Sequence, residues 1–200
     1  MEKAIFMGRK ILIVYAYPED SGFAETIIEY YTRGLKETDA NYLLLNIAQI
    51  KFDPILWGGY NSTQEMEPDI IEAQQHIAWA DHLVFAYPMW WGGMPALLKG
   101  FIERTFLPGF SFRFLSGGKI EKLLTGKTAR LIVTMHMSPK EYIDKMCAAG
   151  ERMFRDAILN FCGIDDIETN YIGPIYKAGE EQKNSWFSDL QHAGKMDAER

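Results

Sequence analysis

Three short segments carry side chains that suit ligand binding, and each directly follows an apolar run. The first is Tyr17–Thr26, in which Ser21 and Thr26 offer hydroxyl groups and Gly22 allows close approach. Where such a segment opens a helix, its free N–H groups and the helix dipole favour a phosphate group. Ser21 as a simple helix cap is the alternative that the local sequence leaves open. No GxGxxG pattern is present, so the common dinucleotide fingerprint is absent.

The second segment is Tyr87–Pro95, which reads YPMWWGGMP. Trp90 and Trp91 are adjacent, so their side chains project in different directions and are not expected to be two ordinary core residues. Together with the two glycines that follow, they predict a flat wall for a planar ring. A protein–protein interface is the alternative, because tryptophan is enriched there as well. Both hypotheses hold if the site lies at a subunit boundary.

The third segment is Thr134–Pro139, with Tyr142 close behind it. Thr134 and His136 offer hydrogen-bond donors, and Tyr142 offers a phenol. His136 is a candidate general acid or charge partner, and a structural or solvated histidine is the alternative. No chemistry is assigned to the other three histidines, which are His76, His82 and His192.

These three segments must be positioned by the elements that precede them. Short apolar runs of strand length alternate with stretches of helical periodicity, and the predicted strands are 10–17, 42–47, 82–87, 129–134 and 166–172. This alternation is typical of an α/β fold with a parallel sheet covered by helices on both faces. Ligands of such sheets bind beyond the carboxyl ends of the strands, where the three segments begin.

The remaining stretches have weaker patterns. Residues 48–67 are predicted to form a long surface loop, which is often functional, and residues 107–118 are predicted to be irregular. A last helix is expected over 179–192, followed by a frayed polar tail over 193–200. The whole chain, 1–200, is expected to form a single domain.

Composition excludes several classes of protein. The 200 residues carry a net charge of −6, which argues against nucleic acid as a partner. Two cysteines, Cys147 and Cys162, cannot form a disulfide framework, and they suit the reducing cytoplasm. No run approaches 18 apolar residues, so no membrane span is expected. We find no convincing spacing of metal ligands, so no metal is expected.

A longer block of sequence resembles a known family. Tyr87–Pro95 continues as Ala-Leu-Leu-Lys-Gly-Phe-Ile-Glu-Arg-Thr-Phe106, and this block is similar to the NAD(P)H:quinone oxidoreductase family of flavodoxin-like flavoproteins. The family signature places a Trp after Phe-Pro, then Pro-Ala-x-Leu-Lys-Gly and an acidic-Arg pair. The residues that match it are Pro88, Trp91, Pro95, Ala96, Leu98, Lys99, Gly100, Glu103 and Arg104.

This resemblance implies a flavodoxin-like five-stranded parallel sheet of order 2-1-3-4-5, in a homodimer with a flavin site at the interface. By matching positions, the flavin phosphate would lie near Tyr17, Ser21, Gly22 and Phe23. The flavin ring would lie against Pro88, Met89, Trp90 and Trp91, with Thr134, Met135 and His136 on its pyrimidine side. The resemblance also implies that Gln74 contacts the cofactor and that Tyr142 lies close to the ring and the substrate.

The chain departs from the family at several positions. Tyr17 replaces the usual His, Gly22-Phe23-Ala24 replaces Ser-Phe-Asn, and Thr134–Met137 replaces Thr-Thr-Gly-Gly. Ala148 stands where the mammalian enzymes have a relay histidine, so their proton relay does not transfer, and His136 is the candidate substitute. The altered first segment leaves FMN and FAD open as cofactors, with FMN favoured because fewer dinucleotide contacts survive.

The implied activity is hydride transfer from NADH or NADPH through the flavin to a quinone-like acceptor, with both substrates using one slot in turn. Tyr142 and His136 are the candidate catalytic residues. Two alternatives remain at this stage. One is a flavodoxin-like electron carrier, and the other is a regulatory ancillary subunit of a membrane ion-transport system.

Overall fold

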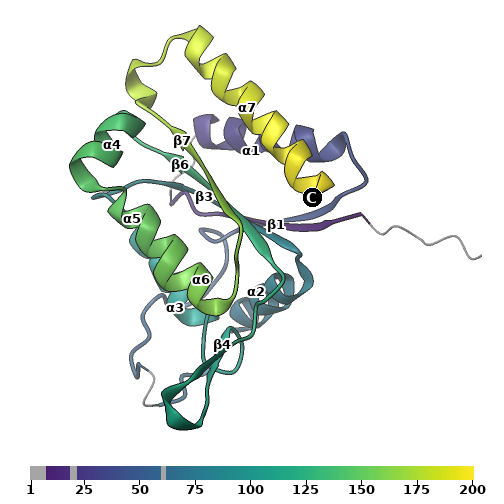
Figure 1. Ribbon diagram of the computed structural model, residues 1–200, viewed down its shortest axis with the longest axis vertical. Coiled ribbons are helices and arrows are strands. Elements are labelled where there is room, and N and C mark those ends of the chain that lie inside the picture. The colour runs from purple at the N-terminus through teal and green to yellow at the C-terminus, as the bar shows by residue number, and fades with distance from the viewer. Residues whose placement is uncertain (1–7, 19–21, 60–61) are drawn as a thin grey trace, which may run out of the picture.

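Five parallel strands form the central sheet in the computed structural model (Figure 1). The structure describes residues 8–18, 22–59 and 62–200. The strands lie in the order β2-β1-β3-β6-β7, which confirms the predicted order 2-1-3-4-5 when the five are counted along the chain. Their bounds are β1 (Lys10–Tyr15), β2 (Asn41–Asn46), β3 (His82–Pro88), β6 (Thr128–Thr134) and β7 (Ile167–Ile172).

Helices cover both faces of this sheet, as predicted. One face packs against α1 (Gly22–Lys36) and α7 (Glu180–Glu199), and the two helices lie side by side in Figure 1. The other face packs against elements that include α2 (Pro68–Trp79), α3 (Ala96–Thr105) and a continuous helical segment made of α5 (Ala149–Arg152), η2 (Met153–Leu159) and α6 (Asn160–Cys162). Alternate residues of β1 therefore enter different cores, because successive strand side chains point to opposite faces.

Close contact between α1 and α7 depends on two glycines. A Cβ atom on Gly34 would lie 1.9 Å from the carbonyl oxygen of Gln191, and one on Gly194 would lie 2.1 Å from that of Tyr31. Only hydrogen fits at these distances, so the two helix backbones approach each other directly. The prediction of a frayed tail over 193–200 is wrong, because α7 runs to Glu199 and is buried along this contact.

The connections before α2 and after α3 differ in how well the sequence predicted them. Residues 107–118 are not simply irregular, since β4 (Phe112–Phe114) and β5 (Ile120–Lys122) pair as an antiparallel hairpin around η1 (Ser116–Gly118). The described part of 48–67 contains no helix or strand, as expected. Arg104 anchors this loop, because its buried guanidinium donates to the carbonyl oxygens of Asp53 and Glu65 and to the carboxylate of Glu67.

Two short elements complete the carboxyl edge of the sheet, namely α4 (Pro139–Met146) after β6 and η3 (Ile175–Lys177) after β7. Ser138 caps α4 in a reciprocal capping box with Glu141, which fixes where the third segment ends. Among the described residues, no helix combines the length and the apolar content that crossing a bilayer requires.

Candidate active site

A cavity of about 370 Å³ opens at the carboxyl ends of β3 and β6. This volume lies within the usual range for small-molecule sites. Its walls come from the second and third segments, joined by one residue at the end of α4 and one in η3. The lining residues are Pro88, Met89, Trp90, Trp91, Gly92, Thr134, Met135, His136, Met137, Met146 and Ile175. The structure therefore brings together the predicted ring-binding residues of both segments.

The register of the sheet explains why these two segments meet. β3 and β6 are parallel neighbours, and Pro88 pairs with Thr134 at their last shared position. The amide of Met89 then donates to the carbonyl oxygen of Thr134 at 2.7 Å. Both chains leave the sheet at the same level, so the segments that follow must form opposite walls of one cavity.

The tryptophan wall is exposed rather than packed into the core. Trp90 and Gly93 exchange backbone hydrogen bonds of 2.9 and 3.0 Å, which closes a tight turn around Trp91 and Gly92. Trp91 occupies a left-handed conformation with φ of 52° and its side chain is fully exposed, while Trp90 is 43% exposed. Because neither indole ring is buried within this chain, both have exposed surface that a planar ligand or a second subunit could cover.

Tyr17 reaches the same cavity from the first segment, but only indirectly. Its hydroxyl donates to Oγ1 of Thr134 at 3.1 Å, and both side chains are buried. Burial raises the pKa of Tyr17 above its ordinary value, so the phenol stays neutral. Tyr17 does not line the cavity. It lies behind Thr134 rather than in a position to touch a bound ring.

His136 lines the cavity and is exposed, so it forms part of the rim. Its ring makes an edge-on contact with Tyr176, with 5.8 Å between the centroids. Our reading of the sequence missed this η3 region, including Ile175 in the wall. The signal was available, because β7 also ends at this edge and its following segment is expected to face the same cavity.

Tyr142 is not brought to the cavity wall. Its side chain is 1% exposed, and its hydroxyl accepts from the amide of Glu151 at 3.0 Å and donates to the carbonyl oxygen of Gly92 at 3.2 Å. Burial also raises the pKa of this phenol. Gly150 lies close to the same turn, since a Cβ there would be 2.1 Å from the Gly92 carbonyl oxygen. Tyr142 thus supports the tryptophan turn from behind.

The other predicted cofactor contacts are dispersed. The Gln74 amide donates to the carbonyl oxygen of Thr105 at 2.8 Å, which joins α2 to α3 away from the cavity wall. Gly22 is exposed at the start of α1, with open space around its Cα. Phe23 packs against Trp186 and Phe187 of α7. Ser21 lies outside the described residues.

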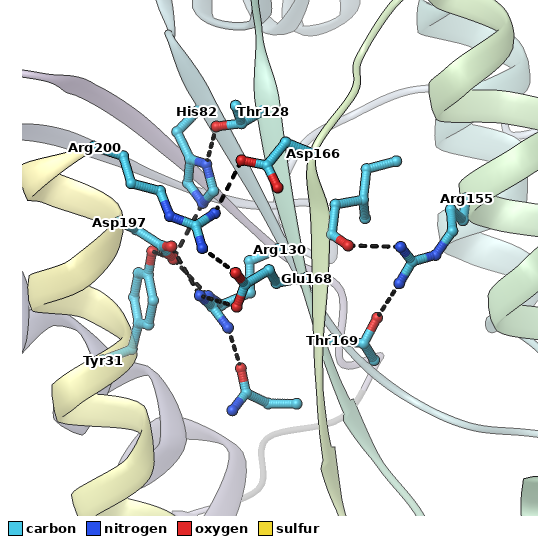
Figure 2. Close-up of polar contacts among 12 residues, drawn as sticks. Tyr31, His82, Thr128, Arg130, Arg155, Asp166, Glu168, Thr169, Asp197 and Arg200 are labelled. Atoms are coloured by element: carbon cyan, nitrogen blue, oxygen red, sulfur yellow. Dashed lines mark hydrogen bonds and ion pairs between the residues drawn. The ribbon is translucent and has the colours of Figure 1, made fainter.

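A second polar cluster lies at the amino ends of the strands (Figure 2). Asp197 of α7 is completely buried and forms a bidentate ion pair with Arg130 of β6, at 2.5 and 2.8 Å. Tyr31 of α1 donates to the same carboxylate at 2.8 Å. Although burial opposes ionisation, the hydrogen bonds from Arg130 and the attraction of His82 hold the pKa of Asp197 below its ordinary value.

His82, the first residue of β3, extends this cluster along the amino edge of the sheet. Its Nδ1 lies 2.6 Å from Oγ1 of Thr128, and its Nε2 lies 3.2 Å from Oδ2 of Asp197, close enough for attraction but outside hydrogen-bond geometry. Burial lowers the pKa of His82, with Arg9 and Arg130 adding to that effect against the attraction of Asp197. These groups join α7 to the sheet, so we assign the cluster to stability rather than to ligand binding.

A family model and several known proteins match most of this chain. A family model described as a flavodoxin-like fold matches residues 9–192. A protein of Haemophilus influenzae named as an uncharacterized NAD(P)H oxidoreductase is 26% identical over 183 residues, which cover 87% of this chain and 88% of that protein. The human protein named ribosyldihydronicotinamide dehydrogenase [quinone] is 26% identical over 212 aligned positions, covering 92% and 91%.

A similar solved structure agrees with these matches. The crystal structure of a Streptococcus mutans protein superposes with a TM-score of 0.80 at 25% sequence identity. The match covers 94% of this chain and 99% of the other. The likeness therefore extends over most of both chains.

Proposed function

The chain belongs to the flavodoxin-like fold family, and on that premise we propose that it is an NAD(P)H:quinone oxidoreductase that works with a bound flavin. Relatives that are named as an NAD(P)H oxidoreductase and a quinone-dependent dehydrogenase align over most of its length, which supports the reaction class. The observation that carries the proposal is the cavity at the carboxyl edge of β3 and β6, where exposed tryptophans face buried and rim-exposed hydrogen-bond donors.

The residues of this cavity suit a flat, partly polar ring. Trp90 and Trp91, with Pro88 and Met89, offer an apolar wall, and the opposite wall contains Thr134 and His136, which both carry hydrogen-bonding groups. Gly22 and Phe23 begin α1, and their end of the helix suits a phosphate group. FMN is the cofactor we propose rather than FAD, because the first segment keeps few of the family's dinucleotide contacts.

When bound, the flavin would take two electrons from NADH or NADPH and pass them to a quinone, with both substrates using the same face in turn. The overall reaction is NAD(P)H plus a proton plus quinone, giving NAD(P)⁺ plus hydroquinone. The hydroxyl of Thr134 would stabilise negative charge that develops on the ring. His136 would hold a proton at its exposed imidazole for the reduced quinone oxygen.

A homodimer completes the proposal. The β4–β5 hairpin carries apolar side chains that are more than 40% exposed, and these are Phe114, Leu115 and Ile120. Beside them lies a second cavity of about 370 Å³, with Phe106, Met153 and Phe161 among its lining residues. Large exposed apolar patches mark protein–protein contacts, so this face suits a second copy of the chain. We propose a cytoplasmic location, since Cys147 and Cys162 are both free thiols.

The direct test is cofactor identification followed by turnover. The purified protein should release FMN on denaturation, or take up FMN on titration of the apoprotein with a characteristic flavin absorbance. NADH and NADPH should then be compared as donors with a benzoquinone or naphthoquinone acceptor. Trp57→Phe is the control for any substitution of Trp90 or Trp91. Trp57 is also an exposed tryptophan, but it lies in the 48–67 loop and does not line the cavity.

Each outcome separates this proposal from the alternatives. Flavin uptake together with quinone reduction supports it. Flavin uptake without quinone reduction favours an electron carrier that works with protein partners. Failure to take up either FMN or FAD at micromolar concentrations would overturn the proposal.

A further inference from the structure

The buried contact between Tyr17 and Thr134 joins the first and third segments directly behind the cavity. Tyr17 is 6% exposed and Thr134 is 3% exposed, and their hydroxyl oxygens are 3.1 Å apart. The two residues lie 117 positions apart in the sequence, so only the fold creates this pair. Of the two, only Thr134 lines the cavity.

The chemistry of the two hydroxyls decides which one donates. Each hydroxyl has one proton to donate and two lone pairs to accept with. A phenol is more acidic than an aliphatic alcohol and is therefore the better donor, while burial keeps the Tyr17 phenol neutral. Tyr17 thus donates to Thr134, in the direction that the geometry also gives.

This donation leaves the Thr134 proton for another acceptor. Thr134 accepts from Tyr17 on one lone pair, and its own O–H keeps a proton to donate at a residue that lines the cavity. A ligand in the cavity would then meet a hydroxyl that is held as a donor. Such an oriented donor suits a carbonyl oxygen or a ring nitrogen that gains negative charge.

We propose that Tyr17 is a positioning residue that orients the Thr134 hydroxyl as a hydrogen-bond donor to the ring bound in the cavity. Tyr17 therefore acts through Thr134, and not as a direct contact to the cofactor phosphate. This inference rests on the proposed function, because it takes a flavin as the bound ring. It gives a role to the position where the chain departs from the histidine that is usual in the family it resembles.

The test is a double-mutant cycle on flavin binding. Tyr17→Phe keeps the ring and removes the donor, so the dissociation constant for FMN should rise about fivefold, as for the loss of one buried hydrogen bond. The flavin midpoint potential should become more negative, because the reduced ring carries more negative charge and loses more stabilisation. A purely structural role of Tyr17 would not shift the potential. Thr134→Val should have a similar or larger effect on both quantities.

If Tyr17 acts through Thr134, the effects of Tyr17→Phe and Thr134→Val on FMN binding should not add. In the Thr134→Val background, Tyr17→Phe should change the FMN dissociation constant by less than about twofold. In the Thr134→Ser background, which keeps the hydroxyl, the full effect of Tyr17→Phe should remain, and this arm serves if Thr134→Val folds poorly. Tyr87→Phe, a buried phenol whose ring packs near Phe154, is the matched control and should bind FMN within about twofold of the wild type.

Two results would overturn the inference while leaving the proposed function intact. One is an additive cycle, which would mean that Tyr17 touches the flavin on its own. The other is a wild-type potential and FMN affinity in Tyr17→Phe. A wild-type protein that takes up neither FMN nor FAD would instead overturn the proposed function and this inference together.

Discussion

The two edges of the sheet treat polar side chains in opposite ways. At the amino edge, Asp197 and Arg130 are buried and satisfy each other's charge, with Tyr31 and His82 packed around them (Figure 2). At the carboxyl edge, the cavity is lined by neutral or rim-exposed groups with hydrogen-bonding capacity left over, such as Thr134. Paired buried charges hold α7 in place, whereas spare donors beside an open cavity can act on a ligand. Burial of a polar group therefore indicates function only where its partners leave it a hydrogen-bond donor or acceptor that is still unused.

The largest expected effect comes from breaking the amino edge. Asp197→Asn leaves the buried Arg130 guanidinium without its counter-charge, so the free energy of unfolding should fall by about 3–5 kcal/mol. Chemical denaturation measures this loss. Flavin affinity at the opposite edge should stay within about twofold while the protein is folded. A large loss of flavin affinity in the folded variant would show that the two edges are coupled.

Glu168→Gln is the matched control, because Glu168 pairs with the same arginine from a half-exposed position. This substitution should lower the free energy of unfolding by less than about 1 kcal/mol.

The pH dependence of stability gives a second check on the amino edge. The depressed pKa of Asp197 means that its contribution is present above about pH 4 and is lost as the pH falls below it. The depressed pKa of His82 likewise removes stability as the pH falls below about 6.5. Asp197→Asn should flatten the part of the stability profile below about pH 4.

A smaller effect is expected from the support behind the tryptophan turn. Tyr142→Phe leaves the Gly92 carbonyl oxygen and the Glu151 amide without their shared partner, so stability should fall by about 1–2 kcal/mol. Because the hydroxyl does not reach the cavity, KM should rise as the turn loosens while kcat stays near the wild-type value. A drop in kcat with unchanged stability and flavin content would contradict this assignment and support a catalytic role for Tyr142.

The smallest effect on stability is expected at Trp91, and its sign is reversed. Trp91 is fully exposed and left-handed, so Trp91→Gly relieves backbone strain and should raise the free energy of unfolding by about 0.5 kcal/mol after the entropy cost of glycine. The same change removes part of the cavity wall, so KM for the quinone should rise. Thermal melting and steady-state kinetics measure the two quantities. Loss of stability with unchanged KM would place Trp91 outside the site.

Much of the candidate site could be predicted from the sequence. The runs that became β3 and β6 are apolar and short, and segments that follow parallel strands meet at one edge. This placed the Trp90–Trp91 turn opposite Thr134 and His136, and the cavity joins them. The role of Tyr142 was harder to predict, since nothing local shows that its hydroxyl is occupied by Gly92 and Glu151.

Periodicity and direct chain connection predicted the strands, the helices and the two walls of the cavity, whereas the strand order was implied by the family resemblance. Only the tertiary structure decided which polar groups remain free. Asp197 meets Arg130 across 67 positions and turns a polar tail into a buried helix end. Tyr17 meets Thr134 across 117 positions. Hydrogen bonds between distant segments depend on the packing of the whole chain, so no local pattern reveals them.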